Sequence, residues 1–229
     1  MGALERLDDG IWVAARPLRK TFADLGARMT VVRLEGGGLW VCSPVRLDEE
    51  TRAAVEALGP VRCIVAPNRF HHLFLDPWLR AYPEAERWAA PGLPAKRSDL
   101  DFTATLDDEP PPSWRGTLDQ HHVGGMPAMD EVVFFHAASR TLVVTDLLFH
   151  KRSAQGLQKL FWRANGCYGR LAPSRVLRLL IRERHDLRLS VDRILEWDFD
   201  RVVVAHGDVL ESGGREAVRA GFAWLRAGA

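Results

Sequence analysis

The stretches Thr141-Leu142-Val143-Val144-Thr145-Asp146 and Arg201-Val202-Val203-Val204-Ala205-His206-Gly207-Asp208 share one pattern: an apolar run ends abruptly at a polar side chain. Short runs rich in valine are typical of buried strands. We therefore expect Asp146 and His206 each to follow the carboxyl end of a strand. Binding groups of α/β proteins collect at that end of the sheet, so the two stretches predict a shared site.

A third apolar run ends in the same way. Val61-Arg62-Cys63-Ile64-Val65-Ala66 is typical of a buried strand, and Pro67-Asn68 ends it shortly before His71-His72. Imidazole and carboxylate groups from three strand ends suit zinc, iron or manganese. Adjacent residues of an extended strand point to opposite sides, so both histidines reach one ion only through a turn. The predicted metal ligands are His71, His72, Asp146 and His206.

Around these runs the sequence alternates predicted strands and helices. Further strands are expected at 11–15, 29–34, 39–42 and 131–135, the last pairing antiparallel with 141–145. Helices are expected at 48–58, at 73–81 and after the last strand. Residues 91–116, rich in Pro, Asp and Ser, indicate a loop with one short strand. Apolar residues at three-to-four spacing predict helix from Ser153 to Glu196.

The composition favours a folded, soluble protein with no global electrostatic preference. The 229 residues include 31 Lys and Arg against 30 Asp and Glu, and 47% are hydrophobic. This balance indicates neither nucleic acid nor an anionic membrane as a partner. The chain lacks an apolar run of membrane-spanning length. Its three cysteines form no Cys-x-x-Cys pair, which suits a reducing compartment, so we expect the protein in the cytoplasm. From its length we expect one domain over 1–229.

The order of these features resembles the metallo-β-lactamase superfamily over nearly the whole chain. In that family a strand leads into a His-x-His-x-Asp-His motif, followed by a Gly-His loop, an Asp after a strand and a His after the last strand. Asp146 and His206 match the last two features. The resemblance implies a four-layer αββα sandwich, with a helical insertion at about 153–196 before the last strand.

The first half of the family's pattern is altered in this sequence. Asn68-Arg69-Phe70-His71-His72-Leu73 lies where the first motif belongs, with Asn68 and Phe70 at positions where the family has histidines. Gly125 replaces the histidine of the Gly-His loop. The chain therefore resembles a divergent branch of unknown function with a degraded motif.

Two functions follow from this altered pattern. The first is a metal-dependent hydrolase with a reduced, mononuclear site that acts on a small-molecule substrate, in which Asp208 orients or deprotonates water. The second is a non-catalytic binding or scaffold protein that keeps the fold without the metal. Non-haem iron chemistry is a third alternative, because two histidines and a carboxylate also bind iron. A nicotinamide or flavin site has no supporting glycine motif.

Other polar and aromatic residues have ordinary structural explanations. Trp162 and Trp197 have core-like spacing, whereas Trp78 is a candidate wall of the pocket near His71-His72. His136 and His150 are expected in a hairpin and on the surface, and the His121-His122 pair at a strand end is a weaker site candidate. The basic residues of the helical region are interpreted as a solvated face: Lys159, Arg163, Arg175, Arg178, Arg182 and Arg184.

Overall fold

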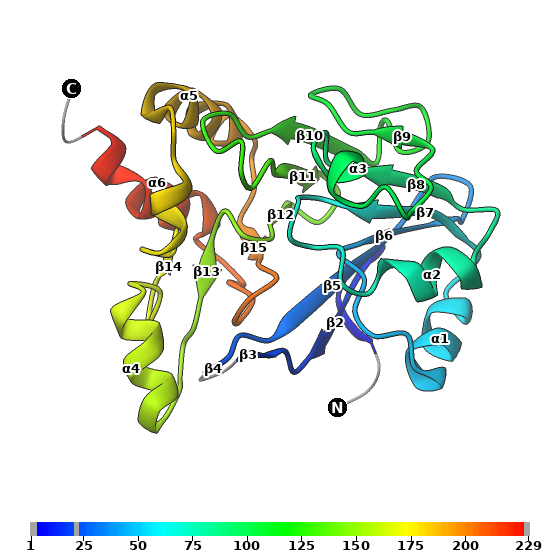
Figure 1. Cartoon of the computed structure of the whole chain (residues 1–229), viewed down its shortest axis with the longest axis horizontal. Helices are drawn as coiled ribbons and strands as arrows, with labels where there is room; N and C mark the ends of the chain where they lie inside the picture. Colours follow the sequence, from blue (N-terminus) through cyan, green and yellow to red (C-terminus); the bar gives the residue numbers. More distant parts are fainter. Residues whose placement is uncertain (1–3, 21–22, 227–229) are drawn as a thin grey trace.

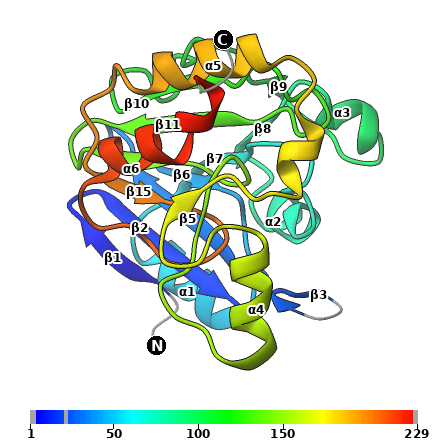
Figure 2. The same cartoon turned by 90° about the vertical axis from the view of Figure 1, so that its left-hand side faces the viewer.

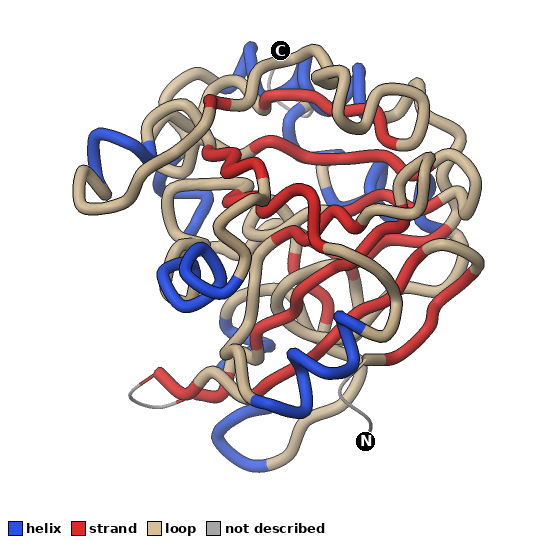
Figure 3. The backbone as a smooth tube through the Cα atoms, turned by 90° about the vertical axis from the view of Figure 1, so that its right-hand side faces the viewer, coloured by secondary structure: helices blue, strands red, loops and turns tan. Residues whose placement is uncertain are grey.

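The computed structural model describes residues 4–20 and 23–226. Figure 1 shows two packed β-sheets, with α1 (Glu49–Glu56) and α2 (Leu75–Ala81) outside one sheet and α5 (Arg184–Ile194) and α6 (Gly214–Gly221) outside the other. The tube in Figure 3 shows the strands crossing the middle of the molecule, with helices and loops around them.

The larger sheet has seven strands, whose order across the sheet follows their order in the chain: β1 (Glu5–Asp8), β2 (Ile11–Arg16), β5 (Ala27–Arg33), β6 (Leu39–Cys42), β7 (Val61–Ala66), β8 (Glu86–Ala89) and β9 (Ala104–Thr105). The strands from β1 to β6 pair antiparallel. Those from β6 to β9 pair parallel, with α1 connecting β6 to β7 and α2 connecting β7 to β8. Antiparallel neighbours need only short turns, whereas parallel neighbours need crossovers.

The smaller sheet has four strands in the order β10 (Leu118–His122), β11 (Val132–His136), β12 (Thr141–Val143) and β15 (Arg201–Val203). The first three pair antiparallel, and β15 pairs parallel to β12. Two short antiparallel pairs lie outside the sheets: β3 (Arg19–Lys20) with β4 (Ala23–Asp24), and β13 (Phe149–His150) with β14 (Leu171–Ala172).

Side chains that alternate between the two faces of each sheet give the molecule four layers. In β6, Trp40 and Cys42 lie in the core between the sheets, whereas Leu39 and Val41 belong to the core beneath α1 and α2. Successive side chains of a strand point to opposite faces, so each sheet packs on both sides. A third core joins the smaller sheet to α5 and α6. The predicted four-layer arrangement of helices and sheets is therefore present.

The predicted strands and helices around the site are present, with ends shifted by a few residues. Strand β8 was not predicted, because Glu86 and Arg87 occupy half of its four positions. The helical prediction for 153–196 was partly wrong. Only α4 (Gly156–Ala164), the 3-10 helix η1 (Leu177–Leu180) and α5 are helical there, because Gly166, Gly169 and Pro173 interrupt the pattern around β14.

Among the described residues, no helix combines the length and the hydrophobicity needed to cross a bilayer.

Candidate metal centre

Three strand ends bring His71, Asp146 and His206 together. His71 lies in the loop between β7 and α2, Asp146 follows β12 and His206 follows β15. The larger sheet therefore supplies one side chain and the smaller sheet two. Three of the four side chains that the sequence predicts as metal ligands therefore lie together at the ends of strands, and their role as ligands stays a prediction.

The potential ligand atoms of these residues lie within 4.8 Å of one another. His71 Nε2 is 3.2 Å from Asp146 Oδ2, and His206 Nε2 is 3.3 Å from Asp146 Oδ1. Asp146 and His206 are buried, whereas His71 is partly exposed. The carboxylate therefore lies between the two imidazoles, and His71 connects the group to the surface.

The far ring nitrogens of both histidines are held by the protein. Ser43 Oγ lies 2.6 Å from His71 Nδ1, and the carbonyl oxygen of Gly26 lies 2.7 Å from His206 Nδ1. A carbonyl only accepts, so His206 Nδ1 carries the hydrogen and a neutral ring directs its Nε2 lone pair toward Asp146. A lone pair and a carboxylate this close need a cation between them, either a proton or a metal ion. Two imidazoles and a carboxylate, with each imidazole oriented by a hydrogen bond at its Nδ1 atom, fit a divalent metal ion.

Asn68 links the two sides of the centre. Its Oδ1 accepts hydrogen bonds from the backbone N–H groups of Phe70 (2.8 Å) and His71 (2.9 Å), which orients the loop that carries His71. Its Nδ2 lies 2.8 Å from Asp146 Oδ2 and 3.0 Å from Glu131 Oε2. Asn68 is fully buried. It therefore supports the centre with its amide group, and its oxygen is turned away from the imidazoles.

Glu131 fixes the backbone of the turn that carries Asp146. It is fully buried, and it accepts backbone hydrogen bonds from Thr145 at 2.8 Å, Asp146 at 2.8 Å and Leu147 at 3.1 Å. A carboxylate that accepts several backbone N–H groups fixes the turn that contains them. Glu131 therefore sets the position at which Asp146 leaves its strand.

The two buried carboxyl groups differ in acidity. Burial raises the pKa of Glu131, and the negative charge of Asp146 raises it further. Burial also acts to raise the pKa of Asp146, but the charge of His71 and the hydrogen bonds from both imidazoles lower it strongly. For His206, burial acts to lower the pKa, but the hydrogen bond and charge of Asp146 leave it raised overall. Asp146 is therefore the more acidic carboxyl group of the pair.

The other two predicted site residues lie outside this group. His72 Nδ1 is 2.9 Å from Arg97 Nη1, and burial together with the charges of Lys96 and Arg97 lowers the pKa of His72. The carboxylate of Asp208 contacts Lys151 Nζ at 3.2 Å and the backbone N–H of Arg152 at 2.8 Å. His72 still lines the pocket described next, whereas Asp208 does not.

A pocket of about 390 Å³ opens onto His71, Asp146 and His206. Its wall is mainly apolar, and Leu18 and Leu25 at the ends of the β3–β4 pair belong to it. The other lining residues are Ala27, Ser43, Pro44, Phe70, His72, Leu73, Phe74 and Lys96. Apolar walls with a few convergent polar groups are typical of small-molecule sites.

Two residues that were considered for the site have structural positions. Trp78 is fully buried and donates from Nε1 to the carbonyl of Val45 at 2.7 Å, so it is a core residue outside the pocket. Gly125 lies against the start of α5, where its carbonyl accepts from the backbone N–H of Arg182 at 2.8 Å and of Glu183 at 3.2 Å. The remaining strand-end pair, His121-His122, contacts Asp108 and Asp130 instead of the centre.

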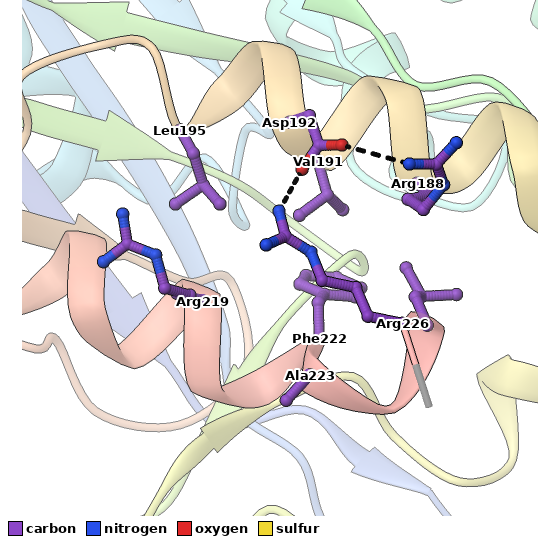
Figure 4. Close-up of a pocket in the computed structure, with 9 residues that line it drawn as sticks. Arg188, Val191, Asp192, Leu195, Arg219, Phe222, Ala223 and Arg226 are labelled. Atoms are coloured by element: carbon purple, nitrogen blue, oxygen red, sulfur yellow. Dashed lines mark hydrogen bonds and ion pairs between the residues drawn. The ribbon is translucent and has the colours of Figure 1, made fainter. Parts of the chain in front are cut away.

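A second hollow, of about 190 Å³, lies between α5 and the C-terminal helices (Figure 4). Its floor is apolar, and Asp192 forms ion pairs there with Arg188 and Arg226. The described residues that line it include no histidine or cysteine. The hollow therefore offers no counterpart to the His71, Asp146 and His206 group.

Sequence reasoning missed Ser43 and Glu131 as members of the centre. Ser43 follows β6 directly, so the strand-end rule that selected Asp146 would also have selected it. Glu131 directly precedes β11, and an acid next to the apolar run 132–135 is a signal of a buried carboxylate. Both residues act by hydrogen bonds that only the folded chain reveals.

Comparison with known proteins identifies the family and the fold. The sequence profile of a family described as a domain of unknown function, DUF4336, matches residues 9–155. Solved structures of metallo-β-lactamases superpose on nearly the whole chain. The enzyme from Pontibacter korlensis has a TM-score of 0.68 at 14% identity, covering 97% of this chain and 98% of that one. FIM-1 from Pseudomonas aeruginosa, in its mono-zinc form, has a TM-score of 0.65 at 14% identity, covering 98% and 94%.

A search of curated proteins by sequence finds no match. The structural likeness establishes the metallo-β-lactamase fold, as the sequence pattern predicted.

Proposed function

We propose that this chain, which belongs to the DUF4336 family, is a metal-dependent hydrolase with one divalent ion held by His71, Asp146 and His206. The observation that carries the proposal is the convergence of two imidazole Nε2 atoms on one buried carboxylate at the base of a pocket. Three protein ligands leave a coordination position open to water or substrate, as in catalytic zinc sites.

The orientation of the ligands supports a metal more than a hydrogen-bonded cluster. Ser43 and the Gly26 carbonyl hold the far nitrogens of His71 and His206, so both Nε2 atoms face Asp146. Outer hydrogen bonds of this kind fix the tautomer and raise the basicity of metal-binding histidines. Phe149 stacks on the His206 ring at 5.3 Å between centroids and restricts its rotation.

When bound, a divalent ion polarises a carbonyl or phosphoryl oxygen and makes hydroxide available near neutral pH. The chain's own residues supply binding and orientation. The apolar pocket wall favours a substrate with an apolar part, and Lys96 brings a positive charge to the pocket. We infer a positioning role for Asp208, whose contacts with Lys151 and Arg152 connect the loop after β15 to the residues after β13.

Adjacent histidines provide a matched test of the metal site. Protein freed of metal with a chelator is titrated with Zn²⁺ by calorimetry and, after reloading, assayed on p-nitrophenyl esters and on bis-p-nitrophenyl phosphate. We expect one Zn²⁺ per chain. We expect His71→Ala to weaken zinc binding at least about 100-fold, and His72→Ala to change it less than about threefold. Absence of stoichiometric zinc on the folded wild-type chain would contradict the proposal.

A metal-free binding protein is the second candidate, and one observation favours it. Asp146 Oδ2 accepts from Asn68 as well as facing His71, so the carboxylate has protein partners without an ion. This candidate predicts that Asp146→Ala lowers stability while no hydrolytic activity exists to be lost. The calorimetric titration separates the two functions, because only the hydrolase requires tight zinc binding.

A further inference from the structure

The charges of this chain are segregated, although they nearly balance overall. Eight of its 31 basic residues lie between Lys151 and Arg182, and none of its 30 acidic residues does. We call residues 151–182 the basic segment. The rest of the chain is therefore net acidic. A local excess of one sign produces a field that the formal charge of +1 does not reveal.

Most cations of the basic segment lack an acidic partner. Lys151 pairs with Asp208 at 3.2 Å. Within residues 4–20 and 23–226, the other seven form no ion pair with a carboxylate: Arg152, Lys159, Arg163, Arg170, Arg175, Arg178 and Arg182. Arg170 and Arg175 lie close together, because Nη2 of the first and Nε of the second are each 3.4 Å from the point where a Cβ atom on Gly166 would lie. Burial, together with the charges of these two residues, lowers the pKa of Arg178. Such unneutralised charge is available to an anionic partner.

Exposed aliphatic side chains lie among these cations. Leu157 is 77% exposed, Leu160 64%, Val176 61% and Leu179 82%. They are four of the seven large hydrophobic residues that are exposed among those described. Leu157 and Leu160 are three residues apart in α4 and so share one face of that helix. Neither is needed for the local core, which Phe149, Trp162 and Cys167 form on the other side.

The two parts of the basic segment are joined into one side of the molecule. The backbone N–H of Arg175 donates to the carbonyl of Asn165 at 3.0 Å, and Ser174 Oγ donates to Asn165 Oδ1 at 3.0 Å. These bonds hold the residues before η1 against the end of α4. Figure 2 shows α4 and the yellow stretch that follows it on the side that faces the viewer.

We propose that the basic segment docks on the surface of an anionic lipid bilayer, with its arginines and lysines at the headgroups and its exposed leucines and valine at the acyl boundary. Cations interleaved with exposed aliphatic residues are typical of interfacial binding, which requires no membrane-spanning helix. A nucleic acid would use the cations alone and leave the aliphatic side chains in water. The proposal differs from the expectation of no membrane partner, which rested on a net charge averaged over two unlike regions.

The docking side lies next to the candidate metal centre. Leu25, which lines the pocket, packs against the core of Phe149, Trp162 and Cys167 beneath the basic segment. Phe149 also stacks on His206. The pocket and the docking side therefore share a wall, although the proposal does not depend on a bound metal or on hydrolysis.

Vesicle sedimentation tests the proposal with the full chain. Vesicles of phosphatidylcholine with about 30% phosphatidylserine are compared with vesicles of phosphatidylcholine alone, at low and at about 0.5 M salt. We expect binding to the anionic vesicles only, and a loss of that binding at high salt.

Two double variants and a control separate the contributions. Leu157→Gln with Leu160→Gln is expected to weaken binding about tenfold or more. Arg152→Gln with Arg182→Gln, whose side chains have no hydrogen-bond partner among the described residues, is expected to weaken it several-fold. Leu189→Gln, on α5 and 51% exposed, should leave binding unchanged. Circular dichroism checks that each variant is folded.

Three outcomes would overturn the proposal. They are no sedimentation with anionic vesicles, equal sedimentation with phosphatidylcholine alone, and salt-sensitive binding of a DNA duplex without any vesicle binding.

Discussion

Asp146 and His206 reach the candidate metal centre from the loops that follow β12 and β15. Asn68, Phe70 and Gly125, where the resemblance to metallo-β-lactamases led us to expect histidines, occupy three different environments. Asn68 is fully buried and links both sides of the centre. Gly125 packs against α5, and Phe70 lines the pocket with 41% of its surface exposed. The departures therefore differ in structural role, and a histidine introduced at each should have a different effect.

The largest effect is expected at Gly125. Its φ is +80°, and a Cβ atom there would lie 2.2 Å from the carbonyl oxygen of Glu183 and 2.8 Å from the backbone nitrogen of Leu187. Gly125→His should lower the free energy of unfolding by roughly 3–5 kcal/mol, because backbone strain and overpacking add. It should not strengthen zinc binding. Urea unfolding and zinc calorimetry measure the two effects.

A second glycine separates steric clash from backbone strain. Gly169 has a φ of +70°, and a Cβ atom there would meet nothing within 4 Å. Gly169→Ala should cost only about 1 kcal/mol, and Gly125→Ala clearly more. Equal costs for the two alanine variants would mean that the contact with α5 is not what excludes a side chain at position 125.

The next largest effect is expected at Asn68. Asn68→Ala leaves Asp146 without an amide donor and the N–H groups of Phe70 and His71 without an acceptor. We expect a loss of about 2–4 kcal/mol in unfolding free energy and zinc binding weakened about 10–100-fold.

Asn68→His distinguishes a support residue from a lost ligand. If Asn68 is a support, the histidine variant is also destabilised and binds zinc more weakly than the wild type. Tighter zinc binding by Asn68→His would show instead that the position is a vacant ligand site.

The contrast between these positions also explains what the sequence could predict. The fold was predictable because strands can be recognised from local residues alone. Runs such as 61–66 and 201–205 are apolar, and each is followed by a polar residue or a proline that marks its end. Asp146 and His206 were predictable for the same reason, since each directly follows its apolar run, 141–145 or 201–205. The convergence of His71 with them was expected only in outline, because it depends on the turn that Asn68 stabilises.

Other features depend on contacts between distant segments. Nothing local indicates that Asn68 bonds with Asp146, 78 residues away, or that Ser43 faces His71. Asp208 fits the strand-end pattern as well as His206 does, yet Lys151 and Arg152 engage its carboxylate. Spacing could not separate these two residues, because the difference lies in what each side chain meets after folding.

A smaller effect is expected at Ser43, because His71 and His206 differ in the group that contacts their Nδ1 atom. The Nδ1 atom of His71 is held by a side-chain hydroxyl, whereas that of His206 is held by a backbone carbonyl. Ser43→Ala should therefore loosen His71 alone, with about 1 kcal/mol lost in stability and zinc binding weakened about tenfold. Ser43→Thr keeps the hydroxyl and should retain most of the affinity. If the alanine variant binds zinc as tightly as the wild type, Ser43 has no role in orienting His71 for the metal.

The smallest effect is expected at Phe70. Its side chain is partly exposed to solvent, and Lys96 Nζ lies 5.3 Å from its ring centroid. The carboxylate of Asp146, in contrast, is buried. Only the backbone N–H of Phe70 bonds to Asn68, and substitution keeps that group. Phe70→His should change the free energy of unfolding by less than about 1 kcal/mol. Zinc binding should change less than about threefold, because the new imidazole replaces a pocket-wall residue. A gain of tenfold or more in zinc affinity would show that an imidazole at position 70 can reach the proposed metal site, and that the side chain at this position limits the number of ligands.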